Sequence, residues 1–469
     1  MIKKISAFVL LAAITLSFFA VVSCSSEEEV FDVDLDSFEG IDLTGVTFRW
    51  GTPWQSQLYP SEGYSFAGDK MRAHYRKVEE ELKCKIEIVA WEDGGSRIMQ
   101  DIAALLPTID LLDSHSDHGG IQLYRAGLLV AADEVPNMNG LDEKFGPLRF
   151  RQYGVYDGKF YGLYQYNWDF APEFAGGMMF NTDMLTILGI TLPYEFQENK
   201  TWNWATYEEL LYEIDDAAKN AGYGDDFVPY VGHSPSRDAI SFMLMNGCQV
   251  IEKNENGDYV FGLDNSKGLA ALDYLIGLAN KGLMEQRDFQ DFVRNRIGAF
   301  LTAETAVATN HMESNSTAYL PSADYTYGFI NFPVGPDGND SCVSGYVHKT
   351  RRLNWVIDFS GNDLWETGFI LDRLFDPIDE TEGWKTSLER SVFYDYRDFE
   401  NYKFMLENVN FKHDIDLGDK VNSDMDNAFS QAIAGRKSAA EAFESIRDEV
   451  NEALLQGTVW VFEDIVPQE

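Results

Sequence analysis

The sequence has few cysteines, few basic residues and no long apolar run beyond its first 22 residues. Its 469 residues include 4 Cys and 37 Lys plus Arg against 77 Asp plus Glu, which leaves a net charge of −40. Such an acidic chain repels a phosphate backbone, which argues against nucleic acid as a partner. Four cysteines in a chain of this length also exclude a small disulfide-stapled scaffold.

The cysteine spacing gives no sign of a metal or redox centre. Cys84, Cys248 and Cys342 are widely separated and odd in number, so at most one disulfide can form, and the sequence does not say which. No CxxC motif occurs, which argues against a structural zinc site of the usual kind. We therefore expect neither a metal nor a cofactor.

The N-terminus indicates export and attachment to a membrane. Lys3 and Lys4 precede an apolar run from Ile5 to Val22, and Ser23-Cys24 follows. This segment resembles a bacterial lipoprotein signal with its lipobox, which implies cleavage after residue 23 and acyl chains on Cys24. The alternative is an uncleaved membrane helix, since the run is long enough to span a bilayer. In either case the rest of the chain lies outside the cytoplasm.

An acidic segment follows the lipobox. Residues 27–42 contain eight Asp and Glu residues and no Lys or Arg, which predicts a solvated tether over 24–42.

The apolar pattern of the remaining chain alternates between strand and helix periods, which predicts an α/β fold with two lobes. Val46, Phe48 and Trp50 alternate on one face, a stretch with helical spacing follows, and Ile86 with Ile88 alternate again. Strand, helix and strand in this order form a βαβ unit with parallel strands. Further strands are expected at 109–112, 177–180, 228–232 and 327–332, and helices at 71–82, 96–105, 119–126, 206–219 (with Thr206 and Glu209 as capping box), 269–279, 364–374, 424–434 and 439–454.

Eight short motifs follow one another along the chain in a recognisable order. They are AGLL at 126–129, YDGKFYGL at 156–163, MMFNTDML at 178–185, LGITLPYE at 188–195, TWNWATYEEL at 201–210, FLTAETAVATN at 300–310, INFPVGPDG at 330–338 and IAGRKSAAEAF at 433–443. In this order, behind a lipobox, they resemble the extracellular solute-binding proteins of the maltose-binding-protein type, which supply sugars to ABC importers.

The resemblance implies a periplasmic-binding-protein-like fold whose two α/β lobes close on a ligand in the cleft between them. Lobe 1 would hold 43–151 and 308–356, and lobe 2 would hold 152–307 and 357–469. The partners implied are a carbohydrate, the permease subunits of an ABC transporter and the membrane through the N-terminal lipid. The protein would act as a monomer at the cell surface or in the periplasm.

Candidate ligand-binding residues follow from the loops that come after strands, where open parallel sheets bind ligands. In the first lobe, Trp54 offers a stacking face, although it could instead pack the lobe edge, and Trp50 alternates with core residues. Asp117 and His118 could accept from and donate to sugar hydroxyls. With His115 they could otherwise form a metal site or an ordinary helix start.

The remaining candidates come from the resemblance. The full set is Trp50, Trp54, Asp117, His118, Trp168, Arg237, Glu313 and Asn422. Trp168 would stack, Arg237 would grip hydroxyls or an acidic sugar unless it forms a surface ion pair, and Glu313 stands where many relatives place an aromatic ring.

Other functions are weighed against solute binding. The sequence has no GxSxG, HExxH or phosphate-binding loop. A glycan-degrading enzyme is still conceivable because 77 acidic residues make chance carboxylate pairs inevitable. A surface glycan-binding protein or a sensor partner without an importer is the other alternative.

Overall fold

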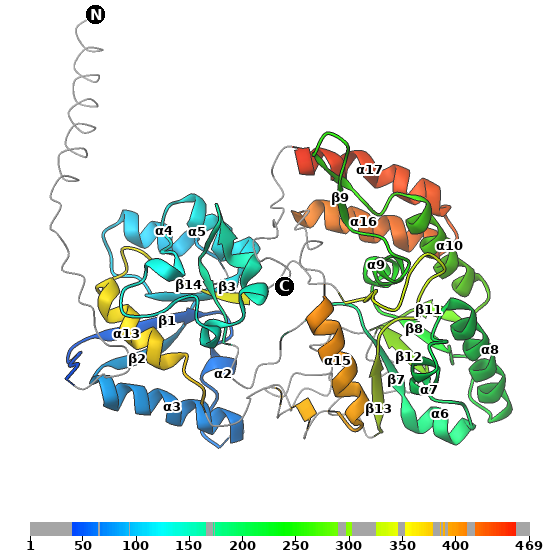
Figure 1. The fold of residues 1–469 in the computed structure, drawn as a ribbon, viewed down its shortest axis with the longest axis horizontal. Coiled ribbons are helices and arrows are strands. Elements are labelled where there is room, and N and C mark those ends of the chain that lie inside the picture. Colours follow the sequence, from blue (N-terminus) through cyan, green and yellow to red (C-terminus); the bar gives the residue numbers. More distant parts are fainter. Residues whose placement is uncertain are drawn as a thin grey trace, which may run out of the picture. The chain divides into compact units, whose positions relative to one another are not determined.

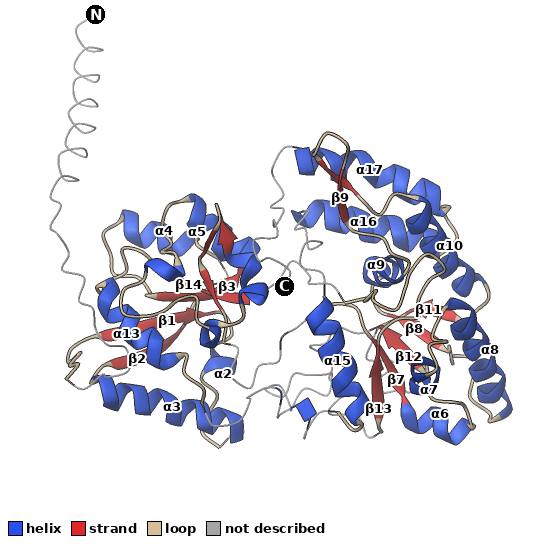
Figure 2. Cartoon of the chain, in the orientation of Figure 1, coloured by secondary structure: helices blue, strands red, loops and turns tan. Residues whose placement is uncertain are grey.

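The computed structural model describes residues 40–455, except 64–65, 93, 166–171, 173, 289–296, 303–324, 346–351, 379–384, 386–387, 390–392 and 410–417. Contacts divide the chain after Ile41, and the helices and strands of the described residues belong to the unit that begins at Asp42. These elements form two α/β lobes, each built on a five-stranded mixed sheet with flanking helices (Figures 1 and 2). No helix among the described residues is long and apolar enough to cross a membrane.

The first lobe contains a sheet with the strand order β2-β1-β3-β14-β6. Strands β1, β2 and β3 are parallel, as the predicted βαβ unit requires, and β14 runs antiparallel to β3 and β6. Its elements are β1 (Thr47–Thr52), α2 (Gln55–Leu58), α3 (Phe66–Leu82), β2 (Lys85–Ala90), α4 (Ser96–Ala103), β3 (Leu111–His115), η1 (Ser116–Gly120), α5 (Ile121–Arg125), η2 (Ala132–Glu134), η3 (Glu143–Phe145), η4 (Leu148–Gly154), β4 (Val155–Tyr156), β5 (Lys159–Phe160), β6 (Gly162–Leu163), β14 (Arg352–Val356) and α13 (Leu364–Leu374).

The second lobe contains a sheet with the order β11-β8-β12-β7-β13. Strand β8 is parallel to β11 and β12, whereas β7 runs antiparallel to β12 and β13. Its elements are β7 (Met178–Asn181), α6 (Thr182–Leu188), α7 (Pro193–Glu198), α8 (Trp204–Asn220), β8 (Tyr230–Gly232), α9 (Pro235–Met245), β9 (Ile251–Lys253), β10 (Tyr259–Phe261), α10 (Ser266–Asn280), β11 (Met284–Gln286), β12 (Phe300–Thr302), β13 (Tyr327–Ile330), α15 (Tyr396–Asn408), α16 (Gly418–Ile433) and α17 (Ala439–Leu455).

The lobe boundaries differ from the sequence-based ones at β4, β5, β6, β13 and α13. Strand β6 pairs with β14 in the first sheet, and β13 pairs with β7 in the second. Helix α13, drawn in yellow in Figure 1, packs against α3 among the blue elements of the first lobe. A buried strand or an amphipathic helix shows its own period in the sequence, but not which sheet it joins.

Two further details of the predicted elements needed correction. Helix α8 begins at Trp204, and its N-cap is Asn203, whose side chain accepts from the amide of Thr206. Thr206 is therefore in the first turn and does not cap the helix. Helix α15 was not expected, although its Asp395 and Asp398 form a capping box. Asp398 also accepts from the amide of Phe329 at 2.7 Å, which fixes α15 on β13.

Candidate functional site

A buried ion pair lies where the strands of the first sheet end. Asp113 on β3 is fully buried and accepts from Thr52 Oγ1 at 2.7 Å, at the last residue of β1. Arg352, the first residue of β14, donates from Nε to Asp113 Oδ1 at 2.5 Å and from Nη2 to the second carboxylate oxygen. Its Nη1 donates to Gln57 Oε1 at 2.6 Å. The guanidinium is therefore held in one orientation by three elements.

Trp54 lies against this ion pair. It is half-buried at the start of α2, directly after β1, and the Arg352 guanidinium carbon lies 4.4 Å from the centre of its ring. A cation over an indole face is a favourable contact. The edge of His115 contacts the same ring system, with centroids 4.8 Å apart. The indole is thus fixed by a cation and an imidazole, in the loop position where a stacking ring was predicted.

His115, the last residue of β3, and His118 on η1 lie together. The rings of His115 and His118 are 5.7 Å apart between centroids and meet edge to face. Among the residues that the structure describes, no group of three or more His, Cys, Asp and Glu side chains could hold a metal ion. His118 lies on η1, half-buried, and Asp117 is on the same turn, although its side chain is outside the described part.

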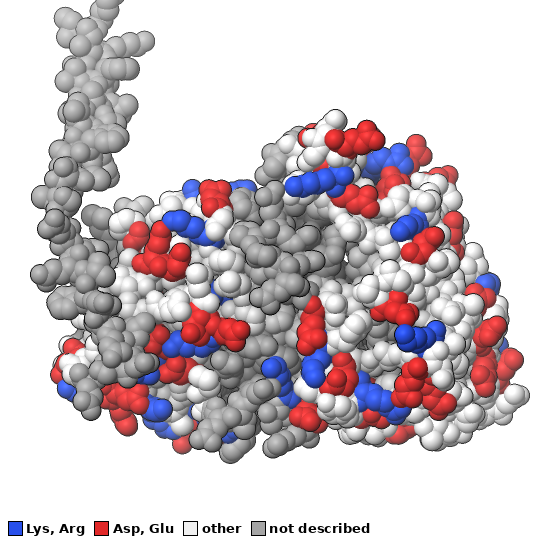
Figure 3. All heavy atoms as spheres, viewed as in Figure 1, with Lys and Arg blue, Asp and Glu red and all other residues white. Residues whose placement is uncertain are grey.

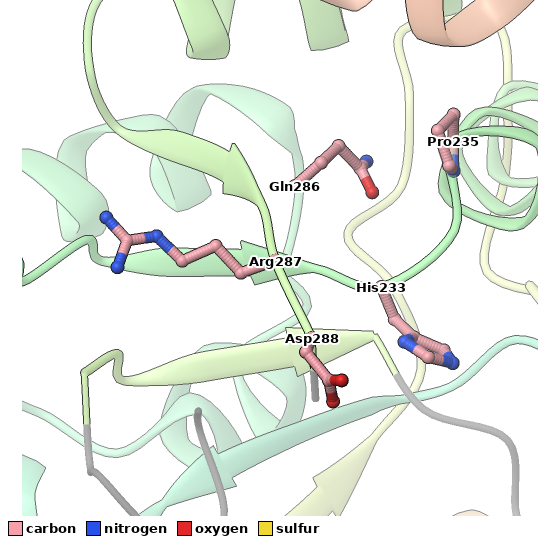
Figure 4. Close-up of a pocket in the computed structure, with 5 residues that line it drawn as sticks. All are labelled: His233, Pro235, Gln286, Arg287 and Asp288. Carbon is pink, nitrogen blue, oxygen red and sulfur yellow. The ribbon is translucent and has the colours of Figure 1, made fainter. Parts of the chain in front are cut away.

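The second lobe has an open hollow at the corresponding position, beyond the carboxyl ends of β8 and β11. Its volume is about 480 Å³, and its lining consists of His233, Pro235, Gln286, Arg287 and Asp288 (Figure 4). Pro235 begins α9 directly after the β8 loop, and Gln286 is the last residue of β11. The hollow is thus lined by an amide, an imidazole, a guanidinium and a carboxylate, together with the apolar ring of Pro235. A few polar groups beside an apolar surface are typical of a small-molecule site.

A buried carboxylate lies behind this hollow. Asp238 on α9 is fully buried, and Gln286 Nε2 donates to its Oδ2. Tyr230 Oη and Thr302 Oγ1, 2.5 Å apart, belong to the same polar group. Burial is the main reason why the pKa of Asp238 is raised, to about 7, and the neighbouring donors only partly offset it. Asp238 therefore fixes the orientation of Gln286 in the wall of the hollow.

The first turn of α9 carries the predicted residue Arg237 and is held by α16. Asp426 on α16 accepts from the amide of Ser236 at 3.1 Å and from its hydroxyl at 2.8 Å, so α16 holds the N-terminus of α9. Arg237 is half-buried on this first turn. Burial, followed by the charge of Arg237, lowers the pKa of His233, which is therefore a neutral donor and acceptor near pH 7.

Asn422 lies one helical turn before Asp426 on α16 and is half-buried. Its Nδ2 is buried, and no described group accepts a hydrogen bond from it. A ligand hydroxyl is one acceptor that would satisfy this donor.

Trp50 does not fit a ligand-facing position. Its side chain is fully buried in the first lobe, donates from Nε1 to Asn354 Oδ1 at 2.9 Å and stacks on Phe375 at 6.1 Å. The strand alternation that Trp50 shares with Phe48 is thus a core pattern. Three further predicted residues, Cys24, Trp168 and Glu313, lie outside the described residues.

The residues that orient the site do not stand out in the sequence. Asp113, Arg352 and Asp238 were not predicted as site residues, because single charged residues at strand ends and helix starts are common in so acidic a chain. Asp113 directly follows the predicted strand 109–112. This position was the only feature of the sequence that could have marked it as a site residue.

Comparison with solved structures identifies the fold. The cyclic α-maltosyl-1,6-maltose binding protein from Arthrobacter globiformis matches at a TM-score of 0.62 and 13% identity, over 88% of this chain and 100% of that one. The sugar-binding protein MalE from Xanthomonas citri gives 0.60 at 12% identity, over 88% and 98%. UgpB from Mycobacterium tuberculosis, solved with glycerophosphocholine, gives 0.58 at 12% identity, over 88% and 99%.

The chain therefore has the two-lobed periplasmic-binding-protein fold that its motifs predicted. No protein-family model and no curated protein matches the sequence.

Proposed function

We propose that the protein is a lipid-anchored, extracytoplasmic solute-binding protein that captures a carbohydrate and delivers it to an ABC transporter. The observation that carries this proposal is that each lobe collects oriented polar groups beyond the carboxyl ends of its strands. In the first lobe these surround Trp54, and in the second they line the hollow at His233. The fold supports the same reading, since its solved neighbours include binding proteins for maltose-type sugars.

The chemistry of the two clusters suits a hydroxyl-rich ligand. Gln286 and neutral His233 offer both donors and acceptors, and Asp288 offers a charged acceptor. Charge-assisted hydrogen bonds to hydroxyls contribute about 1.5–3 kcal/mol each. Trp54 supplies an apolar face for a sugar ring.

The mechanism that we propose is hinge closure. A ligand that contacts both lobes stabilises the closed state, and the population shifts only by that difference in affinity. An oligosaccharide is favoured as ligand, because a stacking ring and a separate polar hollow would serve different sugar units. Asp117, His118, Trp168, Arg237, Glu313 and Asn422 remain predicted contacts.

Ligand-induced compaction tests the function. A thermal-shift screen against mono- and oligosaccharides should identify a ligand, since saturation at 100 times the dissociation constant adds about 2.7 kcal/mol of stability. With that ligand, small-angle scattering should give a smaller radius of gyration than without it. Incubation with the same sugar should release no new reducing ends. Unchanged scattering at saturation would contradict hinge closure, and new reducing ends would indicate a glycan-degrading enzyme.

The anchor is tested separately through Cys24. Cys24→Ala removes the proposed acylation site, and the acidic tether alone has too little apolar surface to hold a membrane. We expect the processed variant to move from the membrane fraction to the soluble fraction, while the wild-type chain stays membrane-bound. A processed Cys24→Ala protein that still sediments with membranes would refute the lipobox.

A further inference from the structure

One end of the first lobe carries exposed apolar residues, which we call the apolar tip: Ala103–Pro107, Phe359 and Trp365. All five residues of Ala103–Pro107 are exposed, with Leu105 at 93% and Leu106 at 56%. Phe359 is 67% exposed and Trp365 44% exposed. Several large apolar side chains exposed at one end of a lobe can mark a surface that meets a partner.

The two loops of the tip lie side by side at the end of the sheet opposite Trp54. A Cβ added at Gly361 would lie 3.8 Å from Pro107 Cβ. Asn362 Nδ2 donates to the carbonyl of Thr47 at 2.8 Å and to Asp110 Oδ2 at 3.0 Å. The loop before β3 and the loop after β14 are thereby joined to the first residue of β1.

Both loops hold an apolar residue in a backbone conformation that costs free energy. Leu105 has φ 55° and Phe359 has φ 60°, in the left-handed region that L-residues with large side chains avoid. Glycine or asparagine would relieve this cost at an ordinary surface turn. Strain kept at an exposed apolar residue in each of two adjoining loops indicates a function for their side chains.

The chain enters the first lobe at this same end. Asp42 accepts from Lys83 Nζ at 2.6 Å, and the amide of Leu43 donates to the carbonyl of Leu82 at 2.9 Å, next to the starts of β1 and β2. Asp42 follows Cys24 by 18 residues. Eighteen residues span at most about 65 Å when fully extended. An N-terminus attached at Cys24 therefore limits how far this end of the lobe can lie from the bilayer.

We propose that the apolar tip inserts into the interface of the membrane to which the N-terminus is attached. The inference rests on the membrane attachment and not on the sugar ligand. Leu, Phe and Trp are the side chains that interfacial segments bury among lipid headgroups. The five residues Ala103–Pro107 carry no charge, and Asp101, Asp358 and Asp363 flank the tip. Insertion is therefore apolar, suits zwitterionic lipid and is insensitive to salt.

Site-specific fluorescence tests the proposal on the full acylated chain in phosphatidylcholine vesicles. A single cysteine introduced by Leu106→Cys or Phe359→Cys carries an environment-sensitive label. Ile187→Cys is the matched control, because Ile187 is an exposed apolar residue, at 78%, on α6 of the second lobe. The fluorescence of the chain labelled without an added cysteine is subtracted, because the native cysteines can also carry label.

Labels at 106 and 359 should be quenched by nitroxide-bearing lipid at least twofold more strongly than the label at 187, and less by aqueous iodide. The difference should persist in 0.5 M salt. For the label at 359 it should disappear when Leu106→Ser is combined with Phe359→Cys. Equal quenching at all three positions would overturn the proposal, as would protection that appears only when a transporter is added. Sugar binding in the same vesicles is scored independently, so failure of the receptor function would show separately.

Discussion

Replacing Arg352 by methionine should lower the free energy of unfolding by about 3 kcal/mol, the lower end of the range for breaking a buried ion pair. The substitution leaves Asp113 fully buried with only the Thr52 hydroxyl of its present side-chain partners. It also removes the cation from the face of Trp54. We therefore expect the affinity for the screened sugar to fall together with stability, both measured on the same preparation by denaturant unfolding and calorimetric titration.

The matched control for Arg352 is Arg373→Met. Arg373 pairs with Asp376 at 3.3 Å in the same lobe, with a similarly exposed side chain, 27% against 25% for Arg352. That pair has no buried carboxylate, and exposed ion pairs contribute only about 0–1 kcal/mol. Equal losses in the two variants would mean that burial of Asp113 does not decide the effect. Unchanged affinity in Arg352→Met would mean that Arg352 does not position Trp54 for binding.

Asp238→Asn should change the pH dependence of stability. Burial raises the pKa of Asp238 to about 7, above the ordinary value of 3.8 for an aspartate side chain. Between these values the folded protein holds a proton that the unfolded chain has lost. The contribution of Asp238 to the free energy of unfolding therefore falls as pH rises through this window, by about 1.4 kcal/mol per pH unit. Asparagine mimics the neutral acid and removes this slope.

Denaturant unfolding of both proteins at several pH values between 5 and 8 measures the effect. We expect the variant to gain stability relative to the wild type as pH rises, by roughly 3 kcal/mol over the range. Asp216→Asn, on the exposed face of α8, is the control, and its difference from the wild type should stay constant. A constant difference for Asp238→Asn as well would show that Asp238 is ionised throughout and is stabilised by its donors.

Surface charge sets a limit on what the sequence can say about the ligand. Figure 3 shows acidic side chains over much of the visible face, with Lys and Arg interspersed among them. The excess of 40 negative charges belongs to the whole chain, whereas the hollow near His233 contains Arg287 as well as Asp288. Salt largely screens charges that lie more than about 8–10 Å from the hollow, so the net charge of the chain does not determine the charge of the ligand.

The sequence alone determined the class of fold and predicted which loops face a ligand. Period-two runs such as Val46 to Trp50 and helical spacing such as Met71 to Leu82 are local properties, and they predicted the βαβ unit that the structure contains. Motif order then indicated the two-lobed fold, and strand ends indicated Trp54 and the β8 loop as ligand-facing positions.

Only the tertiary structure decided which side chains act together. Asp113 and Arg352 are 239 residues apart, and Gln286 reaches Asp238 across 48 residues, so no local pattern links them. The same holds for Trp50, whose burial depends on Asn354 and Phe375. Long-range pairing follows from how strands assemble into sheets, and a residue's own period carries no information about its partner on another strand.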